Sequence, residues 1–358
     1  MSVAPTWPAL LARLLDGGDL TIAEATWAME HVVAGEATPA QLAGFLVALT
    51  AKGETVDEFV GFRDAALAHA RPIDIDPMVL DIVGTGGDPF GAVVNVSSIA
   101  SIVAAAAGVP VAKHGNRGAS SASGASDVLS ALGIDLALEP DAVAGVFREV
   151  GLTFLHAQTF HPGFRHAGPV RRELGIPTLF NILGPLVNPA RPEASAVGVA
   201  SLDRVPLVVG VFRTRGATAL VYRGDDGIDK LTTTGHSHMW EVSRGSVTEH
   251  DLDPRELGIG YSTIDEILGG SPEHNAGIAR AVLAGEPGAV RDIVLLNAAA
   301  GLVSFRLAED PAQIARPITE RLREQLEIAE QAVDSGRAER KLAEWAAATQ
   351  RAAPSATA

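Results

Sequence analysis

The chain has 358 residues, of which 47% are hydrophobic, so it can bury a large core and is expected to form two or three domains of roughly 100–200 residues. A formal net charge of −15 argues against nonspecific binding to nucleic acid or anionic membranes, because both need a basic surface. The absence of cysteine excludes disulfides and thiolate catalysis. With no signal sequence and no run of ~18 apolar residues, a cytoplasmic protein is expected.

The first 70 or so residues contain three capping boxes, in which a threonine is followed three positions later by Glu or Gln ahead of an apolar run with helical spacing. Together with the segment Trp7–Leu15, they predict about four short helices. We expect these helices to form an all-helical domain over residues 1–74. The capping boxes are Thr21/Glu24, Thr38/Gln41 and Thr55/Glu58.

From Val79 onward, strand-like apolar runs alternate with helical patterns, which predicts an α/β domain over residues 75–351 with a mostly parallel central sheet covered by helices. Around Arg244-Gly245 the pattern predicts a hairpin, and residues 352–358 are expected to be a disordered tail. The expected strands are Val79–Val83, Val109–Lys113, Leu152–His156, Ser195–Ala200, Thr218–Arg223, Met239–Ser243 and Ser246–His250. The expected helices are Asn95–Ala107, Gly124–Leu132, Pro140–Val150, Asp203–Gly216, Asn275–Ala284, Arg291–Leu302 and Pro317–Ser335.

Two motifs, GTGGD (84–88) and KHGNR (113–117), each fall where a buried strand is expected to stop. Ligands of open α/β sheets bind at such strand ends. Glycines at the first motif let backbone N–H groups approach an anion closely, and Lys113, His114, Asn116 and Arg117 supply charge and donors at the second. The pair of motifs predicts a phosphate pocket.

The residues around GTGGD do not fit a dinucleotide site, because the final glycine of that fingerprint is missing and Lys113 stands where an acidic ribose ligand is expected. The loop from Asp88 instead runs into Asn95, Ser97 and Ser98 at the start of an Ala-rich helix. Free N–H groups and hydroxyls at a helix N-terminus suit a diphosphate. Asp88 and Ser97 are expected close enough to help order a metal ion.

Three further clusters have competing interpretations. The histidines of the segments 161–166 and 236–238 lack a complete set of metal ligands, so neither pair is interpreted as a metal site. Arg171 lies on an ordinary charged helix face or else binds a carboxylate through both guanidinium nitrogens. The acidic run Asp225–Lys230 is a magnesium site or a plain Asx-rich turn.

Taken in order, the motifs GTGGD, NxS, KHGNRxxSSxSG, FHPxxRH, PVRRELGIPTxFNxLGPLxNPA and GDDGxD, after a helical N-terminal segment, resemble those of the anthranilate phosphoribosyltransferases. The resemblance runs from about Trp7 to Ala346, and KHGNR together with the downstream FNILGPLVNPA segment is its most specific part. It implies transfer of phosphoribose from 5-phosphoribosyl diphosphate to the amine of anthranilate, in tryptophan biosynthesis. It also implies Mg²⁺ and a homodimer built through the helical domain, which a segment around residues 160–190 rejoins.

The resemblance also implies roles for individual residues. Ser97 and Asp229 are expected as metal ligands, and no residue is expected as a general acid or base. Residues expected at anthranilate are Gly84, His114, Asn116 and Arg171. Residues expected at the sugar diphosphate are Gly84, Gly87, Asp88, Asn95, Ser97, Ser98, Lys113, Gly115, Asn116, Arg117, Gly118, Ala119, Ser120 and Ser121.

The chain departs from the family pattern around the diphosphate and the metal. Lys230 stands where the family usually has glutamate, the loop Pro89–Val94 is one residue longer than expected, and Val93 replaces a hydroxyl residue. One hypothesis is that the Lys230 ammonium substitutes for a second Mg²⁺, which leaves one ion. On the sequence alone, a phosphoribosyltransferase or phosphorylase with another acceptor and a catalytically silent ligand-binding protein remain alternatives.

Overall fold

The computed structural model describes residues 4–116 and 123–353. Its first four helices form the predicted helical domain, and the three predicted capping boxes are all present. In each box the threonine side chain accepts from the backbone N–H three residues on, and the Glu or Gln side chain there accepts from the threonine N–H. Both bonds satisfy first-turn donors that have no partner within the helix. The helices are α1 (Trp7–Leu15), α2 (Ile22–Ala34), α3 (Pro39–Lys52) and α4 (Val56–Ala68).

The α/β domain is built on a seven-stranded sheet of order β3-β2-β1-β4-β5-β6-β7. The strands β1 to β5 run parallel, and β6 and β7 are antiparallel, so the predicted fold class is confirmed. The strands are β1 (Leu80–Gly84), β2 (Val111–Gly115), β3 (Leu152–His156), β4 (Ala194–Gly198), β5 (Thr218–Gly224), β6 (Ser237–Ser243) and β7 (Ser246–Leu252).

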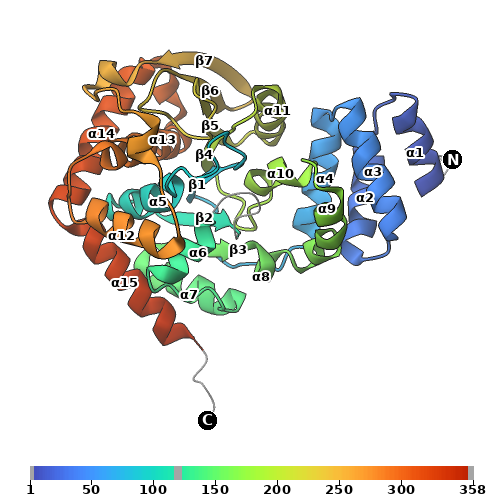
Figure 1. The fold of residues 1–358 in the computed structure, drawn as a ribbon, viewed down its shortest axis with the longest axis horizontal. Helices are drawn as coiled ribbons and strands as arrows, with labels where there is room; N and C mark the ends of the chain where they lie inside the picture. The colour runs from blue at the N-terminus through green and yellow to red at the C-terminus, as the bar shows by residue number, and fades with distance from the viewer. Residues whose placement is uncertain (1–3, 117–122, 354–358) are drawn as a thin grey trace, which may run out of the picture.

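Helices cover both faces of this sheet, and the helical domain lies beside it (Figure 1). The helices α5, α13 and α14 pack together on one face, and α11 packs between β5 and α4 on the other. Side chains of successive strand residues point to opposite faces: Ile82 belongs to the first apolar cluster and Val83 to the second, which also includes the helical domain. The helices are α5 (Val96–Ala106), α6 (Ala125–Ala131), α7 (Pro140–Val150), α8 (Ala157–Phe160), α9 (Gly168–Leu174), α10 (Phe180–Leu183), α11 (Val205–Arg215), α12 (Pro272–Leu283), α13 (Ala289–Glu309), α14 (Ile318–Asp334) and α15 (Arg337–Ala352).

The hairpin between β6 and β7 has the two-residue turn that its sequence predicts. Ser243 pairs with Ser246, and the turn residues Arg244 and Gly245 have φ values of 49° and 78°. Two consecutive left-handed residues form a type I′ turn, whose twist matches that of the flanking strands. This antiparallel ribbon ends the sheet on the β7 side.

The segment after β3 returns to the helical domain. A 3-10 helix, η1 (Pro162–His166), packs against α2, and α9 packs against α3. At Gly163 the approach is so close that an added Cβ would lie 2.5 Å from the Val33 carbonyl oxygen. The segment carrying Arg171 therefore lies between the helical domain and the sheet (Figure 1).

The short helices α8, α9 and α10 are not among the expected helices, and the structure differs from the sequence prediction in three further ways. First, α15 was not predicted, and α13 extends well beyond the predicted Arg291–Leu302. Second, β1 and β2 end at Gly84 and Gly115, so the first residues of both motifs belong to strands rather than loops. Third, Ala352 of the expected disordered tail ends α15, whereas residues 354–358 lie outside the described residues. None of the helices within the described ranges has the length and apolarity needed to cross a bilayer.

Candidate functional site

The site is centred on the carboxyl ends of β1 and β4. From β1 the chain proceeds outward through β2 and β3 on one side, and it returns to β4 on the other side. Such a reversal of strand order leaves a crevice where open α/β sheets bind ligands. Gly84 and Gly198, the last residues of β1 and β4, are paired directly at this point.

These two glycines make room for Asp229. A Cβ at Gly84 would lie 2.1 Å from Asp229 Oδ2, and one at Gly198 would lie 1.8 Å from the Asp229 carbonyl oxygen. Any side chain at either position would displace the buried aspartate. Gly84, which was predicted to contact both substrates, therefore also positions the predicted metal ligand.

The loop after β1 presents backbone donors. Gly86 and Gly87 both have positive φ, at 70° and 81°, and the Gly86 N–H donates to Asp229 Oδ2 at 2.7 Å. No atom lies within 4 Å of a Cβ built on Gly87, so this side of the loop is open. Asp88 caps the following turn, because its Oδ1 accepts from the N–H groups of Phe90 (3.1 Å) and Gly91 (2.7 Å).

The N-terminus of α5 faces this loop without a capping side chain. Asn95 instead holds neighbouring segments together: its Nδ2 donates to the Ser123 carbonyl oxygen at 3.1 Å, and its Oδ1 accepts from Asn275 Nδ2 at 2.9 Å. Ser98 Oγ is buried with no partner among the described residues. An uncapped helix N-terminus with an unsatisfied buried hydroxyl is suited to an anion.

Lys113 is buried beneath the first motif. Its Nζ donates to the Ile82 carbonyl oxygen and to Ser97 Oγ at 3.3 Å, and only 2% of the residue is exposed. Burial lowers the pKa of Lys113 to about 8, against the attraction of Asp81 and Asp229. The buried Lys113 ammonium therefore lies next to Ser97, in the first turn of α5.

His114 points to the opposite face of β2. Its Nδ1 donates to the Gly184 carbonyl oxygen at 3.0 Å, while its buried Nε2 has no partner among the described residues. Burial, together with the charge on His161, lowers the pKa of His114 to about 3. The ring is therefore neutral at pH 7, and Nε2 can accept a hydrogen bond.

Arg171 lies on α9 with its guanidinium 5.1 Å from the ring centroid of Phe180. Phe180 in turn packs edge-on against Phe164. Desolvation by burial lowers the pKa of Arg171, and no carboxylate pairs with it in the parts of the chain that the structure describes. A half-buried guanidinium held by an aromatic face is suited to a planar anion.

The acidic run after β5 forms a turn in which Asp226 and Asp229 have different partners. Asp226 is structural, since it accepts from the Ile228 N–H at 3.1 Å and from the hydroxyls of Thr232 and Thr234. Asp229 faces the site, with Lys230 Nζ bonded to its Oδ1. Across the described ranges, no group of three His, Cys, Asp or Glu side chains could hold a metal ion.

Comparison with known proteins identifies the family. Two family models match: "Glycosyl transferase family, helical bundle domain" over residues 8–70 and "Glycosyl transferase family, a/b domain" over residues 76–339. A Clavibacter michiganensis protein named anthranilate phosphoribosyltransferase is 70% identical over 98% of this chain and 99% of its own length. The chain belongs to the anthranilate phosphoribosyltransferase family.

Solved structures of this family share the fold. The Thermus thermophilus anthranilate phosphoribosyltransferase has 39% sequence identity and a TM-score of 0.86, with 95% of this chain and 99% of that chain covered. The Saccharomyces cerevisiae anthranilate phosphoribosyltransferase, solved in complex with PRPP and Mg, has 26% identity and the same TM-score of 0.86, over 96% and 98% of the two chains.

Several of the predicted site residues lie outside the described residues or have contacts with neighbouring segments. Arg117–Ser121 lie outside the described residues. Gly115 packs against β3, since its Cβ would lie 2.9 Å from the Phe154 ring. Asn116 follows β2 and accepts from the Ser126 N–H at 3.4 Å through its carbonyl oxygen.

Sequence reasoning missed Asp81 and Asn188, two buried polar residues between β1 and β2. Asn188 Nδ2 donates to Asp81 Oδ2 at 2.8 Å. The signal for Asp81 was present, because a carboxylate in the middle of an apolar strand is costly unless it is paired.

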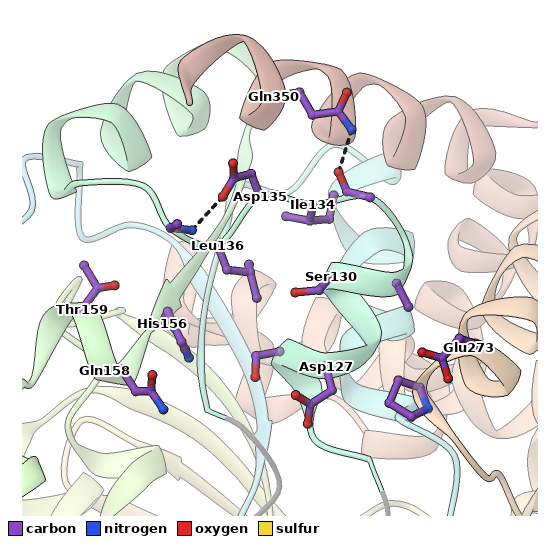
Figure 2. A pocket seen from close by; sticks show the side chains of 15 residues that line it. Asp127, Ser130, Ile134, Asp135, Leu136, His156, Gln158, Thr159, Glu273 and Gln350 are labelled. Atoms are coloured by element: carbon purple, nitrogen blue, oxygen red, sulfur yellow. Dashed lines mark hydrogen bonds between the residues drawn. The ribbon is translucent and has the colours of Figure 1, made fainter. Parts of the chain in front are cut away.

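A polar cavity of about 930 Å³ opens beyond the carboxyl end of β3 (Figure 2). It lies between α6, α12 and α15, and Figure 2 shows Asp127, His156 and Glu273 lining it. Among the predicted substrate residues that the structure describes, none lines this cavity.

Proposed function

We propose that this chain transfers the 5-phosphoribosyl group from 5-phosphoribosyl 1-diphosphate to the amine of anthranilate, releasing diphosphate. The observation that carries the proposal is the 70% identity to an anthranilate phosphoribosyltransferase over nearly the whole of both chains. The geometry supports it, because the uncapped N-terminus of α5 offers an anion site and the Arg171 guanidinium has no carboxylate partner among the described residues. The reaction belongs to tryptophan biosynthesis.

The donor diphosphate binds over the loop after β1. Gly87 leaves open space for it, and the uncapped N-terminus of α5 with Ser98 provides an anion site. Lys113, reaching Ser97 from below, contributes positive charge to the leaving group. Phosphate groups are stabilised at such N-termini by backbone N–H groups and the helix dipole together.

Anthranilate binds on the His114 side of β2. The Arg171 guanidinium pairs with its carboxylate, and Phe180 orients the guanidinium. Neutral His114 offers Nε2 as an acceptor for the anthranilate amine. Because the pKa of His114 is only about 3, this nitrogen orients the amine but is too weak a base to deprotonate it at pH 7.

The chemistry needs no general base. An aromatic amine is already a free nucleophile at neutral pH, so the difficult step is departure of diphosphate from the ribose carbon through an oxocarbenium-like state. Fixing donor and acceptor in line and stabilising the departing negative charge are expected to supply most of the rate acceleration. Once the C–N bond has formed and the C–O bond to diphosphate has broken, the proton of the resulting ammonium passes to the released diphosphate or to water.

We further propose that Mg²⁺ is required, as the PRPP and Mg complex of the yeast relative suggests. Ser97 Oγ and one Asp229 oxygen would hold it together with the substrate phosphates, which is the usual way Mg²⁺ binds at phosphate sites. When bound, the ion neutralises charge on the leaving diphosphate. Because Lys230 Nζ already bonds Asp229 Oδ1, we infer that one ion binds rather than two.

We also propose a cytoplasmic homodimer formed through the helical domain. Leu15 on α1, Val47 on α3 and Ile176 beside α9 are exposed by 77%, 43% and 43%. Large apolar side chains exposed on the helical domain support subunit contacts there. The proposed domains are residues 1–74, joined by residues 160–190, and residues 75–351; the two family matches and the packing of α9 on α3 support this division.

A turnover assay tests the proposed function. Loss of anthranilate fluorescence is followed with 5-phosphoribosyl diphosphate and Mg²⁺, and diphosphate release is measured in parallel. Stoichiometric loss of anthranilate and release of diphosphate are expected. Binding of the sugar diphosphate in isothermal titration without turnover would instead identify a catalytically silent relative, and turnover with a different acceptor alone would reject anthranilate.

A further inference from the structure

The backbone pairing of β1 with β2 stops after the first residues of the two strands. All residues of both strands are among the described residues. Within them, β1 and β2 are paired at one position, Leu80 with Val111, at the start of both strands. By contrast, β1 pairs with β4 along its whole length, as far as Gly84 with Gly198. The part of the two strands without paired register contains the first residues of both motifs, Gly84 in β1 and Lys113 to Gly115 in β2.

Side chains replace the missing ladder bonds on the His114 face. Asp81 Oδ1 accepts from the His114 N–H at 3.2 Å, and Asp81 Oδ2 accepts from Asn188 Nδ2 at 2.8 Å. Asn188 Nδ2 also donates to the Ala112 carbonyl oxygen at 2.8 Å. The Asp81 carboxylate therefore pairs with the His114 N–H of β2, and the Asn188 amide pairs with the Ala112 carbonyl group of β2.

On the opposite face, Lys113 crosses the same gap in the other direction, since its Nζ donates to the Ile82 carbonyl oxygen of β1. Asp81, Lys113 and Asn188 are exposed by 1%, 2% and 3%. The Asp81 carboxylate, the Lys113 ammonium and the Asn188 amide thus connect the two strands, and all three are buried from water.

Stability alone does not account for this arrangement. Desolvating a carboxylate and an ammonium is costly, and well-packed apolar residues of similar size are often as stable or more stable. Apolar residues would also let β1 and β2 pair to their ends and close the gap. The buried polar set keeps the gap open at the point where the two proposed substrates meet.

We propose that Asp81, Asn188 and Lys113 form a bridge that holds the carboxyl ends of β1 and β2 apart and sets the spacing between bound donor and bound acceptor. This inference rests on the proposed function. Asp81 and Asn188 are positioning residues, because they touch backbone and each other rather than substrate. Misplacing reacting groups by about 1 Å can cost roughly 100-fold in rate.

The test is the substitution Asp81→Asn, which keeps the size of the side chain. One of the two carboxylate oxygens becomes an NH₂ group, and this donor then faces the His114 N–H or the Asn188 Nδ2, which are donors themselves. We expect kcat to fall by roughly 10- to 100-fold, while the Kd of the sugar diphosphate and the KM of anthranilate stay within about 2-fold of wild type. Adding Asn188→Asp restores one donor–acceptor pair and is expected to recover part of kcat.

Glu241→Gln is the matched control. Glu241 is likewise a carboxylate with 1% exposure, paired with buried Arg321 on α14, and it lies outside the crevice. We expect this variant to lose thermal stability with kcat unchanged. If Asp81→Asn behaves in the same way, or if it loses both substrate affinities along with kcat, the bridge has no positioning role.

Asn188→Ala provides a second route if Asp81→Asn does not fold. It removes the donors to Asp81 and to the Ala112 carbonyl group, and the same selective loss of kcat is expected. Wild-type turnover with anthranilate decides the proposed function separately, so failure of that function and failure of the bridge are distinguished.

Discussion

Lys230 offers a direct test of how the metal site works. Its ammonium bonds Asp229 Oδ1, and the two side chains are exposed by 12% and 6%. Mg²⁺ binding at Asp229 must therefore displace or tolerate a neighbouring positive charge. Replacing Lys230 by glutamate removes this competitor and adds a second carboxylate, so it is expected to tighten Mg²⁺ binding.

The magnitude follows from Coulomb's law. Two unit charges about 4 Å apart interact by roughly 4 kcal/mol at an effective dielectric constant of ~20. Solvent access and side-chain relaxation reduce this value, and we expect about 1.4–2.8 kcal/mol, which is a roughly 10- to 100-fold lower Kd for Mg²⁺. Lys230→Ala, which only removes the competitor, is expected to give a smaller gain.

The assay is isothermal titration of Mg²⁺ into enzyme saturated with diphosphate, which reports binding without turnover. Lys341→Glu on α15 is the control, because it makes the same charge change far from the site at a lysine bonded to the Val150 carbonyl oxygen. The reasoning is refuted if Lys230→Glu and Lys341→Glu have the same Mg²⁺ affinity as wild type. A second binding event appearing only in Lys230→Glu would support the one-ion enzyme.

Three more outcomes are expected. Arg171→Ala raises the KM for anthranilate by roughly 10- to 100-fold through loss of a charge-assisted pair, whereas Arg172→Ala leaves it unchanged; steady-state kinetics would contradict this if both variants match wild type. Burial holds the pKa of His161 at about 4, below the 6.5 of the unfolded chain, so its contribution to stability is present above pH 6.5 and lost as pH falls toward 4. His161 should contribute roughly 1–2 kcal/mol to the fall in the free energy of unfolding between pH 6.5 and 5, in addition to the contribution of buried His114. In urea unfolding, a His161→Gln variant that loses as much stability as wild type would reject this cause. Leu15→Asp with Val47→Asp is expected to yield a monomer in light scattering, and an unchanged mass would place the dimer contact elsewhere.

Local chemistry made much of the fold predictable. The capping boxes at Thr21, Thr38 and Thr55 mark helix starts because their hydrogen bonds form within four residues. The turn at Arg244-Gly245 was predictable for the same reason. These features depend little on the rest of the chain.

The helix α15 was missed because its apolar face is small. Ala338, Leu342, Trp345 and Ala348 are buried against α7 and α5, but charged residues dominate the sequence between them. The buried residues have helical spacing, so the pattern was present in the sequence. The α7 and α5 segments that this face packs against are far away in the sequence, and the pattern alone does not identify them. Tertiary packing decides such a helix.

The sequence predicts which strand ends the site occupies better than it predicts the arrangement of side chains there. The motifs GTGGD and KHGNR come to the same edge of the sheet because the carboxyl ends of parallel strands converge there. That Lys113 is buried and crosses to β1 depends on where β1 and β2 stop pairing. Strand register over such a distance is not encoded in any single motif.

Gly84 and Gly198 also limit how this enzyme can evolve. Each lies against Asp229 so closely that even alanine would collide with it, so neither strand end can acquire a new side chain while that carboxylate stays in place. Changes in which metal ion binds, or in how tightly it binds, must then come from residues that border the crevice but do not pack against Asp229 as these glycines do. Lys230 is such a position, and a mutational library aimed at altered ion dependence would gain more there than at the glycines.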